Sequence, residues 1–131
     1  MTFDSKAEMN FYKFLTGRKI KFEFQKRIDL TRNTLKKNKN VLLLSKHGYT
    51  QVYLKVDFVF DLHGITYYID TKGSKDFVDP VSKLKYRLLA FKLFEEGKAD
   101  TSRIKFIYMD GMESAMYSII ALQQGNKNVD I

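Results

Sequence analysis

Apolar residues recur at helical spacing near both ends of the chain. Apolar side chains three and four positions apart predict a helix over about residues 5–15, with Asp4 or Ser5 as its N-cap and Gly17 at its end. The same spacing predicts an amphipathic helix over residues 112–122. Both helices are expected to pack one face against a sheet.

A third helix is predicted between these two. It begins at Asp79-Pro80, because an N-cap residue followed by a first-turn proline is typical of helix starts, and Gly97 ends it. Its basic residues are expected to occupy other faces than its apolar stripe. That stripe is predicted to be buried and consists of Val81, Leu84, Leu88, Phe91 and Phe94 or Glu95.

Strands are predicted from alternating and from continuous apolar runs. Residues 19–30 alternate between apolar and polar, and the β-rich runs 53–61 and 65–71 flank Leu62-His63-Gly64, the pattern of a hairpin. Two shorter apolar strands are predicted at residues 41–44 and 104–109. On the first hairpin strand, the residues predicted to share one face are Leu54, Val56, Phe58 and Phe60. This order of elements predicts an α/β domain with a mixed central sheet flanked by helices.

Composition narrows the class of protein. With 131 residues, 44% of them hydrophobic, the chain can build one compact domain, expected over residues 1–125 with a flexible tail at 126–131. The absence of cysteine excludes disulfides and thiolate metal sites, and two histidines are too few for a histidine-rich zinc centre. No apolar run approaches the roughly 20 residues that cross a bilayer, and the first residues lack a secretory core, so we expect a cytoplasmic protein without a membrane partner.

The net charge of +8 is unevenly placed. Residues 1–50 carry 12 Lys and Arg against 4 Asp and Glu, whereas residues 51–131 carry 11 against 11. A basic segment attracts a polyanion such as DNA, while a centre that keeps its carboxylates can bind metal. Solubility alone would also explain the excess of lysine.

The residues that suggest chemistry lie around the predicted hairpin. Asp57 interrupts an apolar strand, and Asp70-Thr71-Lys72 ends the next one, with Asp70 and Lys72 on one face. Asp57 and Asp70 come close only if the two strands are splayed or bulged there. Carboxylates, with the main-chain carbonyl of Thr71, are ligands that Mg²⁺ or Mn²⁺ prefers, and a lysine beside the metal can orient water or stabilise charge on a phosphate. These parts match phosphodiester hydrolysis.

This arrangement resembles the PD-(D/E)xK nuclease superfamily, whose fold is restriction-endonuclease-like. The matching residues are Val56-Asp57 and Asp70-Thr71-Lys72, and the segments 3–8 and 20–25 look like the opening of small phage endonucleases of the junction-resolving type. Two positions depart from the pattern, because Val56 stands where the superfamily has proline and Asp70 where glutamate is commoner.

The resemblance implies a metal-dependent DNA endonuclease, acting on branched or junction DNA in phage DNA metabolism within the host cytoplasm. It implies that Glu8, Asp57 and Asp70 bind Mg²⁺ or Mn²⁺ and that Lys72 is the catalytic lysine, with a supporting role for Gln25. Junction cleavage needs two symmetric sites and hence a homodimer, for which the helix at 112–122 is one candidate interface. The residues expected to contact DNA are Lys6, Gln25, Lys36, Lys37, Lys75, Lys83 and Arg87.

Structural explanations compete with each of these assignments. Glu8 completes a capping box with Ser5, Asp57 could be an exposed acid of an edge strand, and Asp70 with Lys72 could be an exposed ion pair. The basic residues of the helix after Asp79 are also consistent with a solvated face. The competing function is a non-catalytic nucleic-acid-binding or phage assembly protein that retains the nuclease fold.

Overall fold

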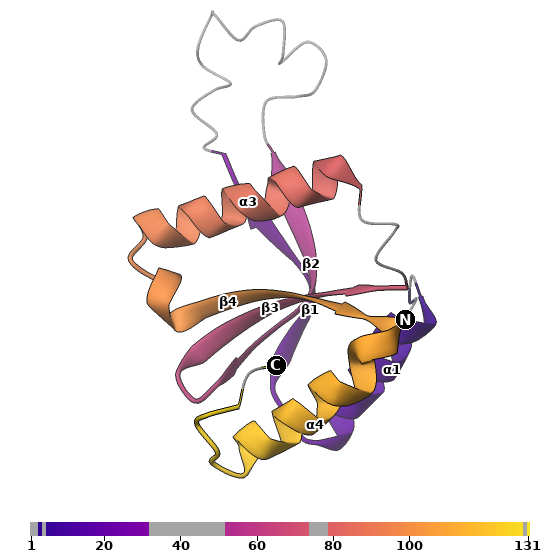
Figure 1. Cartoon of the computed structure of the whole chain (residues 1–131). Helices are drawn as coiled ribbons and strands as arrows, with labels where there is room; N and C mark the ends of the chain where they lie inside the picture. The colour runs from indigo at the N-terminus through magenta and orange to yellow at the C-terminus, as the bar shows by residue number, and fades with distance from the viewer. Residues whose placement is uncertain (1–2, 4, 32–51, 74–78, 130) are drawn as a thin grey trace, which may run out of the picture.

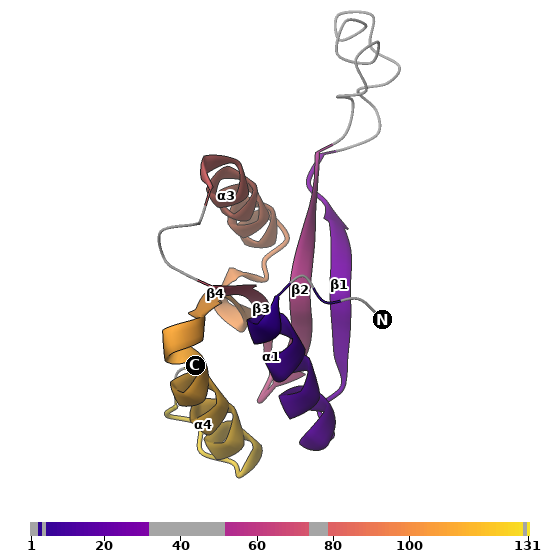
Figure 2. The ribbon, with the colours of Figure 1, turned by 90° about the vertical axis from the view of Figure 1, so that its right-hand side faces the viewer.

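A four-stranded sheet forms the centre of the protein, with helices on both of its faces (Figures 1 and 2). The computed structural model describes residues 3, 5–31, 52–73, 79–129 and 131. In chain order the elements are α1 (Lys6–Gly17), β1 (Phe22–Asp29), β2 (Tyr53–Leu62), β3 (Ile65–Lys72), α3 (Pro80–Glu95), β4 (Ser102–Tyr108) and α4 (Met112–Gln123). The strand predicted at residues 41–44 lies outside the described residues.

The sheet is mixed, as its sequence pattern predicts. Its strand order is β1-β2-β3-β4; β1–β2 and β2–β3 pair antiparallel, and β3–β4 pair parallel. The hairpin turns at His63 and Gly64, both at positive φ, which glycine adopts without steric cost. A parallel pair needs a long crossover, and α3 provides it between β3 and β4. The predicted α/β class, a mixed sheet flanked by helices, is confirmed.

Two apolar clusters lie on opposite faces of the sheet. One joins α1 and α4 to the sheet and includes Phe11, Phe58 and Ile119; the other joins α3 to the sheet and includes Val56 and Leu89. In both views α3 lies above β3 and β4, with α1 and α4 below them (Figures 1 and 2). The fold is therefore three layers deep, and its helices are held by burial of apolar area.

Strands β2 and β3 separate partway along their length. Their pairing runs from Leu62 and Ile65 to Phe58 and Ile69 and stops there. Beyond this point β2 stays paired with β1, while β3 stays paired with β4 as far as Lys72. The start of β2 lies behind α3, whereas the end of β3 runs to the right of the view (Figure 1). We call this separation the sheet fork.

The fork overturns one expectation about β2. Leu54 and Val56 pack in the cluster under α3, whereas Phe58 and Phe60 pack in the cluster with α1 and α4. The prediction that all four share a face is wrong, because strict alternation holds only while a strand keeps one orientation toward the core. The change of face occurs around Asp57, the residue between the two pairs.

The predicted apolar stripe of α3 is also wrong. The buried residues of this helix are Tyr86, Leu89 and Leu93. The residues predicted to be buried are instead exposed: Val81 (60%), Leu84 (57%), Leu88 (39%), Phe91 (60%) and Phe94 (70%). Helix α3 has apolar residues on two opposite sides, so spacing alone could not tell which side meets the sheet.

The first and last helices follow their predicted patterns. Helix α1 buries Ala7, Phe11 and Leu15, and α4 buries its apolar stripe, including Ile119. Within the range predicted as a flexible tail, Val129 and Ile131 are partly buried against the same cluster as α1 and α4.

Candidate carboxylate and lysine site at the sheet fork

A pocket of about 320 Å³ lies at the sheet fork. Its lining comes from α1, β2, β3 and α3, so four segments distant in sequence meet there. The polar residues that line it are Ser5, Glu8, Lys55, Asp57, Asp70, Thr71, Lys72, Ser82 and Tyr86. The predicted catalytic residues Glu8, Asp57, Asp70 and Lys72 all lie on this one pocket.

Asp57, on β2, is held by hydrogen bonds from β3 on the other side of the fork. Its Oδ2 accepts a hydrogen bond of 3.0 Å from the Thr71 backbone N–H and one of 3.1 Å from Thr71 Oγ1. Burial raises the pKa of Asp57 to about 9, helped by a hydrogen bond to Asp70 and by the charges of Asp70 and Glu8. The side chain is half-buried, which argues against the exposed edge-strand acid. In the metal-free pocket Asp57 therefore stays protonated at neutral pH, because ionising it there would destabilise the folded state.

Asp70 and Lys72 form an ion pair in the same pocket. Lys72 Nζ lies 2.9 Å from Asp70 Oδ2, and the Asp70 side chain is 8% exposed. Burial by itself lowers the pKa of Lys72, but its hydrogen bond to Asp70 and the charges of Asp70 and Asp57 raise it above its usual value overall. The pair is real, as the structural explanation required, but its acid is buried rather than exposed.

Glu8 lies in the capped first turn of α1 and also on the pocket. Its backbone N–H donates to Ser5 Oγ at 3.1 Å, so Ser5 is the N-cap of α1 and the glutamate belongs to the first helical turn. Its side chain is nevertheless almost fully buried, lines the pocket, and accepts a 3.3 Å hydrogen bond from Gln25 Nε2. Helix α1 thus carries a carboxylate to the fork, and Gln25 orients it.

Gln25 sits on β1 at the level of the fork. The ladder pairs Phe24 with Phe58 and Lys26 with Val56, so Gln25 lies across from Asp57. Its φ of 51° is left-handed, a conformation that costs about 1 kcal/mol or more outside glycine. This backbone distortion occurs where the sequence predicted a regular strand, and it coincides with the contact to Glu8.

Tyr86 is a residue of the pocket that sequence reasoning missed. It extends from α3, is 4% exposed, and its hydroxyl oxygen has no hydrogen-bond partner within the described residues. Burial raises the pKa of Tyr86 strongly, and the charges of Asp70 and Asp57, with the closeness of its hydroxyl to Asp70, add to the shift. The sequence does show a tyrosine in the helix that follows the Asp-x-Lys strand. It gives no reason to expect that tyrosine in the pocket, because the apolar stripe predicted for this helix lies on its other side.

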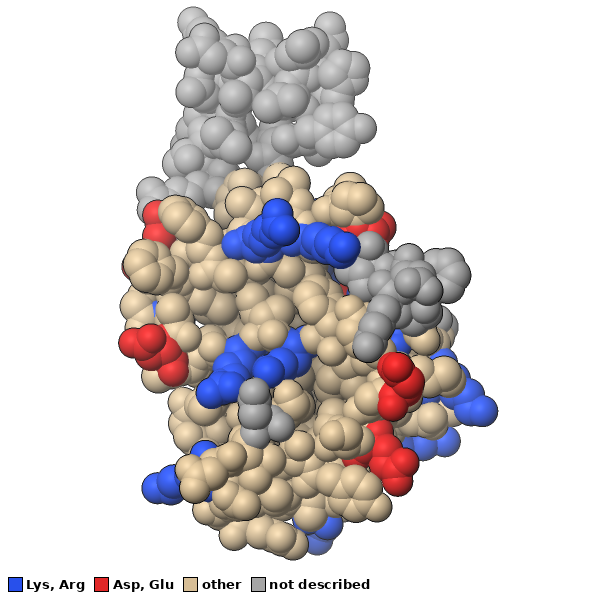
Figure 3. Space-filling view, viewed as in Figure 1, with Lys and Arg blue, Asp and Glu red and all other residues tan. Residues whose placement is uncertain are grey.

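The predicted DNA-contacting residues are scattered. Gln25 belongs to the pocket, Lys6 is exposed at the start of α1, and Lys83 and Arg87 are exposed on α3. Lys36, Lys37 and Lys75 lie outside the described residues. In Figure 3, Lys and Arg side chains gather over α3 and over β4 below it. The structure therefore brings the catalytic set together but not the DNA-contacting set.

The acidic side chains of the pocket are of the chemical type that binds a hard divalent cation. Glu8, Asp57 and Asp70 offer carboxylate oxygens around one pocket with one ammonium group, which leaves an excess of negative charge that a cation would neutralise. Within the described residues, no three acidic or histidine side chains are already arranged as a metal cage. Asp57 is turned toward Thr71 and Asp70 toward Lys72, so binding a cation would require these carboxylates to reorient.

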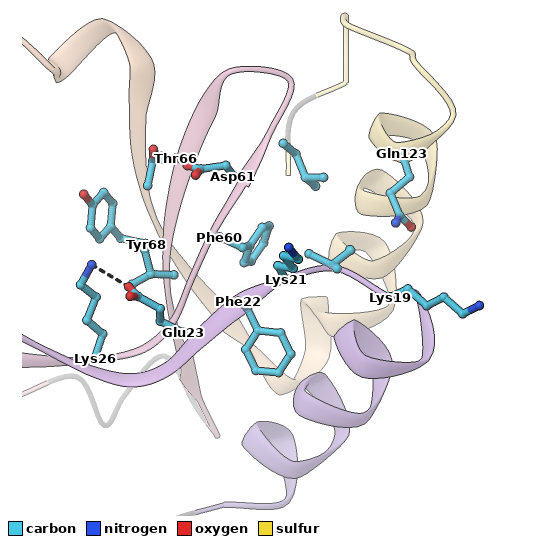
Figure 4. Close-up of a pocket in the computed structure, with 13 residues that line it drawn as sticks. Lys19, Lys21, Phe22, Glu23, Lys26, Phe60, Asp61, Thr66, Tyr68 and Gln123 are labelled. Carbon is cyan, nitrogen blue, oxygen red and sulfur yellow. Dashed lines mark hydrogen bonds and ion pairs between the residues drawn. The ribbon is translucent and has the colours of Figure 1, made fainter.

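A larger pocket of about 750 Å³ lies elsewhere, along β1, β2 and the hairpin (Figure 4). Its acids Glu23 and Asp61 are exposed, and Glu23 forms a 2.6 Å ion pair with Lys26. Exposed charges of this kind interact weakly because water screens them. The smaller pocket at the fork, whose acids are buried or half-buried, is therefore the stronger candidate site.

Comparison of the chain with protein-family models, with curated proteins and with solved structures found no match in any of the three. Within the described part of the chain, no helix combines the length and the apolar character that a membrane crossing requires. The geometry of the fork is consequently the basis on which a function is assigned.

Proposed function

We propose that the protein is a divalent-metal-dependent endonuclease that hydrolyses phosphodiester bonds in DNA. One observation carries the proposal: Asp57 and Asp70 meet where β2 and β3 separate, with Lys72 2.9 Å from Asp70 and Glu8 on the same pocket. A fold gains little stability from burying several acids around one lysine, so this cluster is better explained by a ligand.

Glu8, Asp57 and Asp70 are the residues that would hold Mg²⁺ or Mn²⁺. When bound, the metal would supply Lewis-acid stabilisation of the phosphate and a more acidic water. Because its pKa is raised, Lys72 stays protonated at neutral pH and acts as a cation rather than as a base. Its ammonium group would stabilise the charge that develops on a phosphate oxygen during attack.

DNA is the substrate that the charge distribution favours. The net positive charge of the chain resides in residues 1–50, and exposed basic residues of α3 and β4 include Lys83, Arg87 and Arg103. Such residues bind phosphates without reading sequence. Branched or junction DNA in phage metabolism, within the host cytoplasm, is the substrate class and setting that we propose.

One observation favours the non-catalytic alternative. Asp57 and Asp70 already have protein partners in Thr71 and Lys72, so the cluster could serve as a purely structural network in a nucleic-acid-binding protein. That alternative predicts DNA binding that weakens with salt and does not depend on a divalent metal.

The test is incubation of the purified chain with supercoiled plasmid and with a synthetic four-way junction, in Mg²⁺, Mn²⁺ or EDTA. We expect cleavage only with metal, and cleavage reduced by about 10²-fold or more in Lys72→Ala. Lys98→Ala, which removes a more exposed lysine at the far end of α3, is the matched control and should cleave normally. DNA binding without cleavage in either metal would favour the non-catalytic alternative.

A further inference from the structure

The side of α3 that faces away from the sheet is apolar and exposed. We define the outer face of α3 as Val81, Leu84, Leu88, Phe91 and Phe94, which are between 39% and 70% exposed. The same helix already buries Tyr86, Leu89 and Leu93 under this face. Only one of the two apolar sides of α3 is buried against its own sheet, so the other is available to contact a partner.

The outer face is as large as the largest apolar patch of an ordinary monomer. Two phenylalanines, two leucines and a valine at these exposures present on the order of 500 Å² of apolar surface, the size of the largest patch on ordinary monomers, and such patches are often interaction sites. If two copies covered each other, the apolar contact would approach about 1,000 Å² before its polar rim is added, which reaches the size of a specific interface.

The spacing of the outer face suits another helix. Its residues follow one another three, four, three and three positions apart along α3, which is the spacing of side chains that interlock between two packed helices. Because the outer face is continuous from the first turn to the last, a helix of similar length would cover it fully. Helix α3 of a second copy has that length and that pattern.

Charges along α3 favour an antiparallel pair. Lys83, Lys85 and Arg87 lie in its first half, whereas its end carries both signs of charge, with Glu95 beside Glu96 and Lys92 paired to Glu96 at 2.9 Å. Antiparallel packing places the basic half of one helix beside the mixed-charge end of the other, and it also opposes the helix dipoles favourably. Parallel packing would set the three basic residues beside those of the partner, which is unfavourable.

We infer that the protein forms a symmetric homodimer through the outer face of α3, with the two helices antiparallel and the twofold axis near Leu88. This inference goes beyond the proposed function and does not depend on it. It also replaces the interface suggested at residues 112–122, because the apolar stripe of α4, which includes Ile119 and Leu122, is buried in its own domain and leaves Tyr117 as the one exposed large hydrophobic residue of that helix, all of which the structure describes. The pocket at the fork lies toward the buried side of α3, where Tyr86 reaches it, so the dimer leaves both pockets uncovered by α3 of the partner.

The first test is the mass of the full-length chain in solution, without DNA or metal. Light scattering or sedimentation at about 1 to 100 µM should give twice the 15.4 kDa of one chain at the upper concentrations. The double variant Leu88→Glu/Phe91→Glu should be monomeric, with an unchanged circular dichroism spectrum. Tyr117→Glu, at an exposed aromatic residue of α4, is the matched control and should remain dimeric.

A second test does not depend on a destabilising substitution. The chain has no cysteine, so single cysteines report on contacts between copies. Under mild oxidation Leu88→Cys should form a disulfide dimer rapidly. Val81→Cys should not crosslink with itself, but it should crosslink when mixed with Glu95→Cys.

Several results would overturn the inference. A wild-type monomer throughout the concentration range, a dimer that persists in the double variant, or rapid self-crosslinking of Val81→Cys would each contradict it. Association that occurs only after DNA is added would also contradict it, because DNA rather than the outer face of α3 would then join the copies. None of these measurements uses cleavage. A result that contradicts the dimer would therefore leave the proposed nuclease activity untouched, and the reverse also holds.

Discussion

The sheet fork and the outer face of α3 break the usual distribution of residues in opposite ways. At the fork the fold buries carboxylates, an ammonium group and a tyrosine hydroxyl; on α3 it exposes two phenylalanines and three aliphatic side chains. Buried polar groups and exposed apolar patches are the informative exceptions in a globular protein. Each exception costs the isolated chain stability, and we propose a different partner for each: a cation at the fork and a second copy on α3.

The largest expected effect is the loss of cleavage when an acid at the sheet fork is replaced. Asp70→Asn should reduce metal-supported cleavage by about 10³-fold, because it removes a metal-binding charge and the partner of Lys72, while DNA affinity changes by less than about twofold. The plasmid assay and a filter-binding titration measure the two quantities. Asp61→Asn, an exposed acid of the same hairpin, should cleave like wild type. Full cleavage by Asp70→Asn would remove the fork from the mechanism.

A comparison of variants sharpens the same contrast. Leu88→Glu/Phe91→Glu should lose self-association by about 100-fold or more, since it puts charges into an apolar seam, yet keep metal-dependent nicking of plasmid. Asp70→Asn should do the reverse and remain dimeric. Sedimentation and nicking assays on both variants test this separation. Loss of both properties in either variant would show that the two regions are coupled.

The pH dependence of stability tests the charge buried at the fork. The pKa of Asp57 is raised from 3.8 to about 9 in the folded protein, so the folded state binds more protons than the unfolded state between these pH values. The free energy of unfolding of the metal-free chain should therefore fall as the pH rises from about 5 to about 9, by roughly 1–3 kcal/mol. Denaturant unfolding in EDTA measures it.

Asp57→Asn is the variant that isolates this effect. It should remove most of the decline with pH and should make the metal-free chain more stable than wild type at high pH, because the side chain at position 57 is then neutral at every pH. Added Mn²⁺ should stabilise wild type and not this variant. If wild type and Asp57→Asn have the same pH profile, the carboxylate of Asp57 ionises without cost and the cluster is not strained.

The smallest expected effect concerns Tyr86. Tyr86→Phe removes a buried hydroxyl that has no partner in the described structure, so it should raise the free energy of unfolding by about 1 kcal/mol. Thermal unfolding followed by circular dichroism measures this change. If the hydroxyl contacts the substrate or its bound water, cleavage should fall by about 10-fold at the same time. A gain in stability without any change in cleavage would make Tyr86 a packing residue only.

Local sequence patterns predict the described helices and strands correctly, but they do not predict the buried face of α3 or the change of face in β2. Capping at Ser5 and Asp79, the hairpin at His63 and Gly64, and the order of helices and strands follow from short-range chemistry that the sequence displays. The face of α3 did not follow, because both of its sides are apolar and only packing against Val56 and its neighbours selects one. The face change in β2 likewise depends on strands that lie far away in the sequence.

By itself, the sequence determined which residues could do chemistry: an acid in an apolar strand, Asp-x-Lys on the next strand, and a glutamate in the first helical turn. Only the tertiary structure decided that they share a pocket, because their approach depends on β2 and β3 separating after Phe58 and Ile69. It also added Tyr86 and exposed the outer face of α3. Side-chain type and local spacing are encoded residue by residue, whereas convergence depends on how the layers pack.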